Sequence, residues 1–261
     1  MRFSQMLDGM TATTTGFTAA IDADWLQGCS AFGGLQSALA LRAMRSLVPQ
    51  DMPLRTLQTT FIAPVGAGSV EIRAQVLRTG KSAIHVQATL HHQGQVLCLV
   101  IGVFGSSRPS KIQIVPKRPE VSCGQQLHFR FVPGLTPSFL QHFDVRWLRG
   151  GPPFSGSQLP ENVIGIGMHD DAPATDEHVL AIADVIPPVA LSLLKAPTSG
   201  SSLTWMIEFL RDRFDDLPLQ GWRMDAKLTA AHDGYTSQTG MVWGPGGEAV
   251  ALSRQSMVVF G

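Results

Sequence analysis

The sequence has 261 residues and equal numbers of acidic and basic side chains, so its formal net charge at pH 7 is zero. It contains no block of Lys and Arg, which argues against nucleic acid or an anionic membrane surface as partner. The apolar runs are far shorter than the ~20 residues that span a bilayer, and the first residues lack the apolar core of a signal peptide. We therefore predict a cytoplasmic protein without stable membrane insertion.

The first strong pattern is the stretch 32–48, FGGLQSALALRAMRSLV. Its apolar residues recur at helical spacing, and the apolar surface is too wide for a helix at the protein surface. We predict a mostly buried helix that Pro49 ends. Gly33 and Gly34 lie at its start, where free backbone N–H groups point outward at the positive end of the helix dipole. Without side chains, the two glycines let another molecule approach the backbone closely.

Four predicted strands follow this helix. Residues 70–77 and 83–91 alternate between apolar and polar side chains, which is typical of strands with one buried face. Residues 96–104 are apolar on both faces and predict a central strand. Together with 54–65, these segments predict a helix followed by a mostly antiparallel sheet.

The second half of the sequence repeats this order. Acidic residues after Thr175 predict a helix start, and 179–194 is apolar at helical spacing, with a kink or restart at Pro187 and Pro188. Strands are predicted at 202–209, 222–231, 235–243 and 249–260. We therefore predict an N-terminal unit at 1–110, a linker at 111–137 with one possible strand at 126–132, and a C-terminal unit at 138–261.

The two halves end in the same tripeptide, Val-Phe-Gly, at 103–105 and 259–261. Aligning these endings places Leu99 opposite Gln255. Gln255 lies in an otherwise apolar strand, where a buried amide without partners costs roughly 1–3 kcal/mol. The sequence therefore marks Gln255 as a candidate site residue.

Several segments carry a family resemblance: FGGLQSALALRAM at 32–44, LQTTFIAPV at 57–65, IADVIPPVAL at 182–191, SLTWMIEFL at 202–210 and HDGYTSQTGMVWGPGGEAVALSRQSMVVFG at 232–261. In these segments the sequence resembles the acyl-CoA thioesterases of the thioesterase II type, which contain two fused hotdog folds. The resemblance implies an α+β double hotdog, in which two long buried helices are each wrapped by a curved antiparallel sheet. It also implies a hydrolase of fatty acid metabolism that cleaves an acyl-CoA thioester.

The resemblance further implies that an Asp, a Thr and a Gln of the second hotdog hold a hydrolytic water. The Gln matches Gln255, the Thr matches Thr229, and the Asp falls on Thr204, where this sequence has no acid. We predict Thr204, Thr229 and Gln255 as catalytic residues. We also predict that the helix start at Gly33 and Gly34 binds substrate and stabilises the oxyanion.

No metal or cofactor is implied. His91 and His92 are neighbours in a predicted strand, so their side chains point to opposite faces and cannot chelate together. The cysteines, Cys29, Cys98 and Cys123, share no metal-binding spacing, and we predict reduced thiols. Pairing two hotdogs in one chain leaves sheet edges, so we also expect a homodimer or larger homo-oligomer.

Two alternative functions remain open. The missing acid favours a non-catalytic module that binds acyl-CoA or an acyl lipid. A hotdog dehydratase or hydratase would need a His or an acid near Gly33 and Gly34, and none follows them closely in the sequence. We interpret Asp184 as a hydrogen-bonded structural acid, with a role in a second, vestigial site as the alternative.

Overall fold

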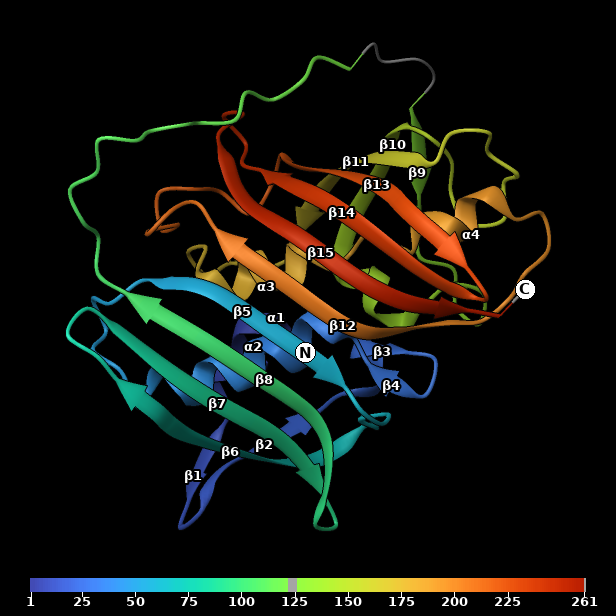
Figure 1. The fold of residues 1–261 in the computed structure, drawn as a ribbon. Helices are drawn as coiled ribbons and strands as arrows, with labels where there is room; N and C mark the ends of the chain where they lie inside the picture. Colours follow the sequence, from blue (N-terminus) through green and yellow to red (C-terminus); the bar gives the residue numbers. More distant parts are fainter. Residues whose placement is uncertain (122–125, 261) are drawn as a thin grey trace.

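The computed structural model describes residues 1–121 and 126–260, which form a large antiparallel sheet of 13 strands and a small sheet of two strands (Figure 1). The strand order is β1-β2-β6-β7-β8-β5-β12-β15-β14-β13-β11-β10-β9. The strands from β1 to β5 in this order belong to the N-terminal half, and those from β12 to β9 belong to the C-terminal half. The halves join through β5 (Leu54–Phe61) and β12 (Gly200–Phe209), where Leu57 lies opposite Ile207. The predicted α+β double hotdog is confirmed.

The N-terminal half wraps its strands around one helix, α2 (Gly33–Arg45). Its other elements are α1 (Phe3–Asp8), β1 (Thr11–Thr13), β2 (Gly16–Ile21), β3 (Leu26–Gln27), β4 (Ser30–Ala31), β6 (Gly68–Thr79), β7 (Ala83–His92), β8 (Gln95–Gly105) and the 3-10 helix Ala23–Trp25. Ten of the 13 residues of α2 are buried, including the small residues Ser37 and Ala40. Because the apolar surface of α2 covers most of its circumference, the helix is enclosed rather than lying on the surface.

The C-terminal half has the same plan, with its helix broken in two. Its elements are β9 (Leu127–Phe129), the 3-10 helix Ser138–His142, β10 (Phe143–Arg149), β11 (Glu161–Met168), α3 (Asp176–Ala183), α4 (Val189–Leu193), β13 (Trp222–His232), β14 (Tyr235–Trp243) and β15 (Ala249–Val259). Pro187 and Pro188 separate α3 from α4, because proline lacks the N–H that a helix interior needs. The predicted restart is therefore present, and β9 falls at the possible strand inside the predicted linker.

The helices α2 and α3 lie against each other in opposite directions at the centre of the molecule. At one end, the N–H of Gly34 donates to the carboxylate of Asp184, directly after α3. At the other end, the guanidinium of Arg45 binds the carboxylate of Asp176, the first residue of α3. The start of α2 therefore meets the end of α3, and this meeting point is where the site forms.

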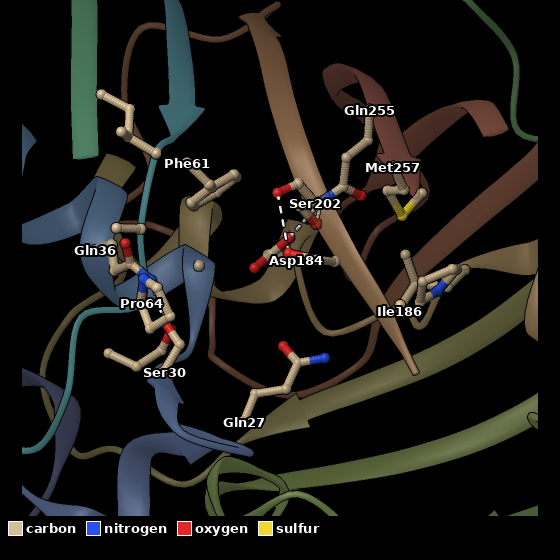
Figure 2. Close-up of a pocket in the computed structure, with 17 residues that line it drawn as sticks. Gln27, Ser30, Gln36, Phe61, Pro64, Asp184, Ile186, Ser202, Gln255 and Met257 are labelled. Atoms are coloured by element: carbon tan, nitrogen blue, oxygen red, sulfur yellow. Dashed lines mark hydrogen bonds between the residues drawn. The ribbon is translucent and has the colours of Figure 1, made fainter. Parts of the chain in front are cut away.

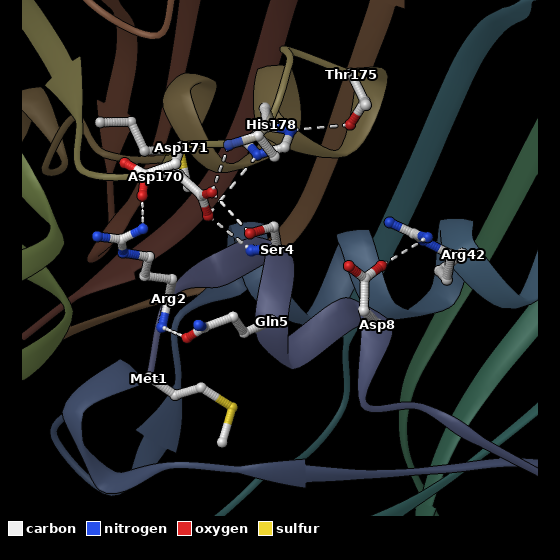
Figure 3. A network of polar contacts seen from close by, with 12 residues as sticks. Met1, Arg2, Ser4, Gln5, Asp8, Arg42, Asp170, Asp171, Thr175 and His178 are labelled. Carbon is white, nitrogen blue, oxygen red and sulfur yellow. Dashed lines mark hydrogen bonds and ion pairs between the residues drawn. The ribbon is translucent and has the colours of Figure 1, made fainter.

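The short helix α1 ties the N-terminal segment to the C-terminal half (Figure 3). The backbone N–H and the hydroxyl of Ser4 each donate to Asp170 at 2.7 Å. The ring of Phe3 packs on the ring of His178 with centroids 5.2 Å apart. These contacts cross between the halves, so α1 adds to the interface that the sheet and the central helices already make.

Within the described residues, no helix is long and apolar enough to cross a membrane. Cys29 is exposed and Cys98 is buried, and both are free thiols. Cys123 lies outside the described residues.

Candidate active site

A cavity of about 210 Å³ lies where the start of α2 meets the C-terminal half (Figure 2). One wall comes from the N-terminal half and the other from the C-terminal half. The lining side chains that carry polar groups are Gln27, Ser30, Gln36, Asp184, Ser201, Ser202 and Gln255. Apolar contacts come from the segment Phe61–Pro64 and from Ile186, Pro188 and Met257. A partly apolar cleft with a few convergent polar groups at an interface between units has the general character of a ligand site.

Asp184 is the acid of this cavity. Its Oδ2 accepts the N–H of Gly34 at 2.8 Å, and its Oδ1 accepts Nε2 of Gln255 at 3.1 Å. Burial raises the pKa of Asp184 to about 7, although these two hydrogen bonds act in the opposite direction. A carboxyl group with a pKa near 7 can take up and release a proton near neutral pH, which is the property of a general base or acid.

Gln255 connects this acid to a hydroxyl group. It lies on β15, is 5% exposed, and faces inward opposite Trp205 of β12. Its Nε2 donates to Oγ of Ser202 at 2.9 Å as well as to Asp184. Because Oγ of Ser202 accepts this bond, its hydroxyl hydrogen is available to another acceptor.

Ser202 faces the cavity because β12 contains a bulge. The pairing of β12 with β15 shifts between Ser202 and Thr204, so that Ser202 lies opposite Met257 and Trp205 lies opposite Gln255. In a regular strand, residues three apart point to opposite faces. The extra residue at the bulge turns Ser202 to the same inner face as Trp205.

The glycines at the start of α2 permit the close approach of α3. A Cβ atom at Gly33 would lie 2.7 Å from Oδ2 of Asp184, and one at Gly34 would lie 2.9 Å from Cα of Ala181. Gly33 lines the cavity, while the N–H of Gly34 is bound to Asp184. The N–H of Gly34, part of the helix start that we predicted to stabilise the oxyanion, therefore already has a carboxylate as its acceptor.

The structure does not bring Thr204 and Thr229 to the cavity. Thr204 directly precedes the inward-facing Trp205 and pairs with Ser256 and Thr60, so it lies on the outer face of the sheet. Thr229 is exposed and forms a hydroxyl contact with Thr239 at 3.4 Å. Of the three predicted side chains, Gln255 lines the cavity and the two threonines do not.

The alignment of the two halves by their endings is also corrected. Leu99 pairs with Thr60 and Thr89 and is half-buried, whereas its neighbours Cys98 and Val100 are fully buried. Leu99 therefore lies on the outer face, and Gln255 on the inner face. The endings match in sequence but not in the direction of the side chains.

Sequence reasoning missed Ser202 and gave Asp184 a structural role. The signal for Asp184 was an acid at the end of an apolar helical run, three residues before the proline pair that stops the helix. Ser202 carried no comparable signal, because the bulge that turns it inward depends on the pairing of β12 with β15. Among the described residues, no group of three or more His, Cys, Asp or Glu side chains could hold a metal ion.

Two family models match the chain. The model of the acyl-CoA thioesterase N-terminal domain matches residues 21–105, and the model of the acyl-CoA thioesterase C-terminal domain matches residues 116–259. Among curated proteins, none matches the sequence.

Solved structures share the fold over nearly the whole chain. A conserved protein of unknown function with a hot dog fold from Alicyclobacillus acidocaldarius is 23% identical with a TM-score of 0.88, over 99% of this chain and 98% of that chain. The tesB protein of Mycobacterium avium subspecies paratuberculosis is 15% identical with a TM-score of 0.78, and the acyl-CoA thioesterase II TesB2 of Mycobacterium marinum is 15% identical with a TM-score of 0.70. Both of these alignments cover 99% of this chain and 98% of the other.

Proposed function

Since the chain belongs to the acyl-CoA thioesterase family, we propose that it hydrolyses an acyl-CoA thioester with a water molecule that Asp184 activates. The observation that carries this proposal is the hydrogen-bonded group of Asp184, Gln255 and Ser202 beside the glycine-opened start of α2. An acid with a pKa near 7, a helix start and a cleft between two units are together suited to hydrolysis of an activated carbonyl.

In the proposed reaction, the carboxylate of Asp184 removes a proton from water as the water oxygen bonds to the thioester carbonyl carbon. The carbon–sulfur bond then breaks, and the proton on Asp184 passes to the sulfur of CoA. The products are a carboxylic acid and a thiol. Ser202 donates its free hydroxyl hydrogen to orient the water, and Gln255 holds both Asp184 and Ser202 in place.

We assign stabilisation of the oxyanion to the N–H of Gly33. This group is one of the first N–H groups of α2, which have no carbonyl partner inside the helix. It lies at the positive end of the helix dipole, which favours the charge that develops on the carbonyl oxygen. Asp184 and Ser202 thus take the roles that the sequence assigned to Thr204 and Thr229, and Gln255 keeps its predicted role.

The missing acid was the reason for the binding-module alternative, and Asp184 supplies an acid from another element. A dehydratase or hydratase needs a second acid–base group beside the first. Among the described residues that line the cavity, Asp184 is the one with a carboxyl group, and none is a histidine. The lining therefore favours hydrolysis over the two alternatives.

The test is to measure the hydrolysis of a panel of acyl-CoA thioesters through the free thiol that is released. Asp184→Asn should lower kcat about 10²- to 10⁴-fold, the range for loss of a general base. Thr204→Val is the matched control on the outer face of β12 and should leave kcat unchanged. Binding of acyl-CoA without hydrolysis by the wild type would favour the binding module, and formation of enoyl-CoA from a hydroxyacyl-CoA would favour the dehydratase.

The homo-oligomer and the cytoplasmic location stay predictions. The strands at the two ends of the sheet order, β1 and β9, each contain three residues. Short edge strands offer few backbone groups for pairing, so an oligomer would form through another surface. Light scattering of the purified chain measures its mass directly.

A further inference from the structure

A continuous set of hydrogen bonds runs from the backbone of α4 to the cavity. The N–H of Val189 donates to Oε1 of Gln238 at 2.9 Å, and Nε2 of Gln238 donates to Oε1 of Gln255 at 3.3 Å. Gln255 in turn donates through its Nε2 to Asp184 and Ser202. Gln238 and Gln255 are direct cross-strand neighbours on β14 and β15. The hydrogen bond between the two amides therefore depends on the register of β14 and β15.

The backbone N–H of Val189 determines the direction of this set. It is the first N–H group of α4 after Pro187 and Pro188, and it has no carbonyl partner within the helix. A backbone N–H can only donate, so it requires the oxygen end of the Gln238 amide. The nitrogen end of Gln238 is then directed at Gln255 and requires the oxygen end of that amide.

Burial of the two amides disfavours other hydrogen-bond partners and other amide orientations. Gln238 is 3% exposed and Gln255 is 5% exposed, so water offers neither amide an easy replacement partner. If the amide of Gln255 were reversed, its oxygen would face the carboxylate of Asp184 and two acceptors would lie together. Buried polar groups left without a partner cost free energy, so the reversed arrangement is disfavoured at both ends.

We propose that Gln238 is a positioning residue that keeps the N–H groups of Gln255 directed at Asp184 and Ser202. It is not among the residues that line the cavity. The inference rests on the proposed function for its effect on rate, but the orientation of Gln255 is a property of the folded chain alone. It also gives the proline pair a role beyond breaking a helix, because the restart at Val189 exposes the N–H that starts the set.

Two substitutions test the inference. Gln238→Met keeps the side-chain volume and removes both polar ends, which leaves Gln255 free to reverse. Gln238→Glu keeps an acceptor for Val189 but presents a second acceptor to Gln255. Both should lower kcat roughly 10-fold, with KM changed less than about 2-fold, as expected for an effect on transition-state stabilisation.

Thr236→Val is the matched control. Thr236 lies two residues from Gln238 on the same face of β14, is 7% exposed, and has a hydroxyl oxygen without a hydrogen-bond partner among the described residues. Its replacement by a side chain of the same shape should leave kcat and KM unchanged. A loss in Thr236→Val equal to that in Gln238→Met would mean that the strand tolerates no change, and would overturn the inference.

A double-mutant cycle separates positioning from general damage. If Gln238 acts through Gln255, Gln238→Met should cause no further loss of kcat in a Gln255→Met background. Additive losses would overturn the inference, because they would show that Gln238 contributes independently of Gln255.

A second measurement needs no activity. The carboxyl carbon of Asp184, labelled with ¹³C, reports its titration by NMR. Because the N–H of Gln255 favours the charged form, Gln238→Met, which adds no charge, should raise the pKa of Asp184 by about one pH unit, and Thr236→Val should not. If the wild type hydrolyses no acyl-CoA, the proposed function fails and this titration alone decides the inference. An unchanged titration in Gln238→Met would overturn it.

Discussion

The surroundings of Asp184 change the chemistry of its carboxyl group. A carboxyl group in water titrates near pH 4, and burial in this cavity raises the pKa of Asp184 to about 7. The folded chain therefore holds a proton on Asp184 over a range of pH in which the unfolded chain does not. Stability therefore falls as the pH rises from about 4 to about 7, because the unfolded chain releases this proton while the folded chain keeps it.

The same shift predicts the pH dependence of the reaction. A general base acts in its ionised form, so kcat/KM should fall below about pH 7 and reach a plateau above about pH 8. A pH series of acyl-CoA hydrolysis with a constant-ionic-strength buffer measures this profile. A rate that is constant from pH 5 to pH 9 would contradict the assignment of Asp184 as the base.

At the scale of residues, the sequence could predict an amide in an apolar strand but not its partners. Gln255 was predicted because an inward-facing polar side chain among apolar residues needs hydrogen bonds. Asp184 and Gly34 are 150 positions apart and meet only when α2 and α3 pack. The sequence alone has no measure of that distance, so Asp184 was interpreted as a structural acid.

At the scale of elements, helices and strands were predictable because their periods differ. The central helix of each half and the strands β5 to β8 and β12 to β15 were predicted with small errors at the ends, whereas α1, β10 and β11 were not predicted. The bulge in β12 was not predictable, because it depends on pairing with β15 rather than on local sequence. That one extra residue decides that Ser202, and not Thr204, shares the inner face with Gln255.

The packing of α2 on α3 gives a prediction that separates chemistry from stability. Gly34→Ala would place Cβ 2.9 Å from the backbone of Ala181, so it should lower the free energy of unfolding by about 1–3 kcal/mol. Gly33→Ala would instead contact the carboxylate of Asp184 at 2.7 Å, a side chain that can move. We expect it to lower kcat strongly with a smaller loss of stability.

Urea denaturation and acyl-CoA hydrolysis together test this contrast. Gly66→Ala is the matched control, because a Cβ atom there meets nothing within 4 Å and Gly66 does not have a positive φ. It should leave both quantities unchanged. Equal effects of Gly33→Ala and Gly34→Ala on both quantities would contradict the separation.

At the scale of the whole molecule, the two halves have different helix starts. The start of α2 carries Gly33 and Gly34, and the start of α3 carries Asp176 and Glu177. Both acids are buried, and they bind Arg45 and Arg42 at the end of α2. The position in the C-terminal half that corresponds to the cavity is thus occupied by two ion pairs whose carboxylates are buried.

This asymmetry predicts one substrate site per chain. A thioether analogue of acyl-CoA, which cannot be hydrolysed, should bind with a stoichiometry of one per chain in isothermal titration calorimetry. Arg45→Met would leave the carboxylate of Asp176 buried without its partner and should lower the free energy of unfolding by roughly 3 kcal/mol. Because Arg45 lies at the opposite end of α2 from Gly33, the variant should keep the stoichiometry and kcat of the wild type at a temperature where it remains folded. Binding of two analogues per wild-type chain would show that the ion pairs do not close the second position.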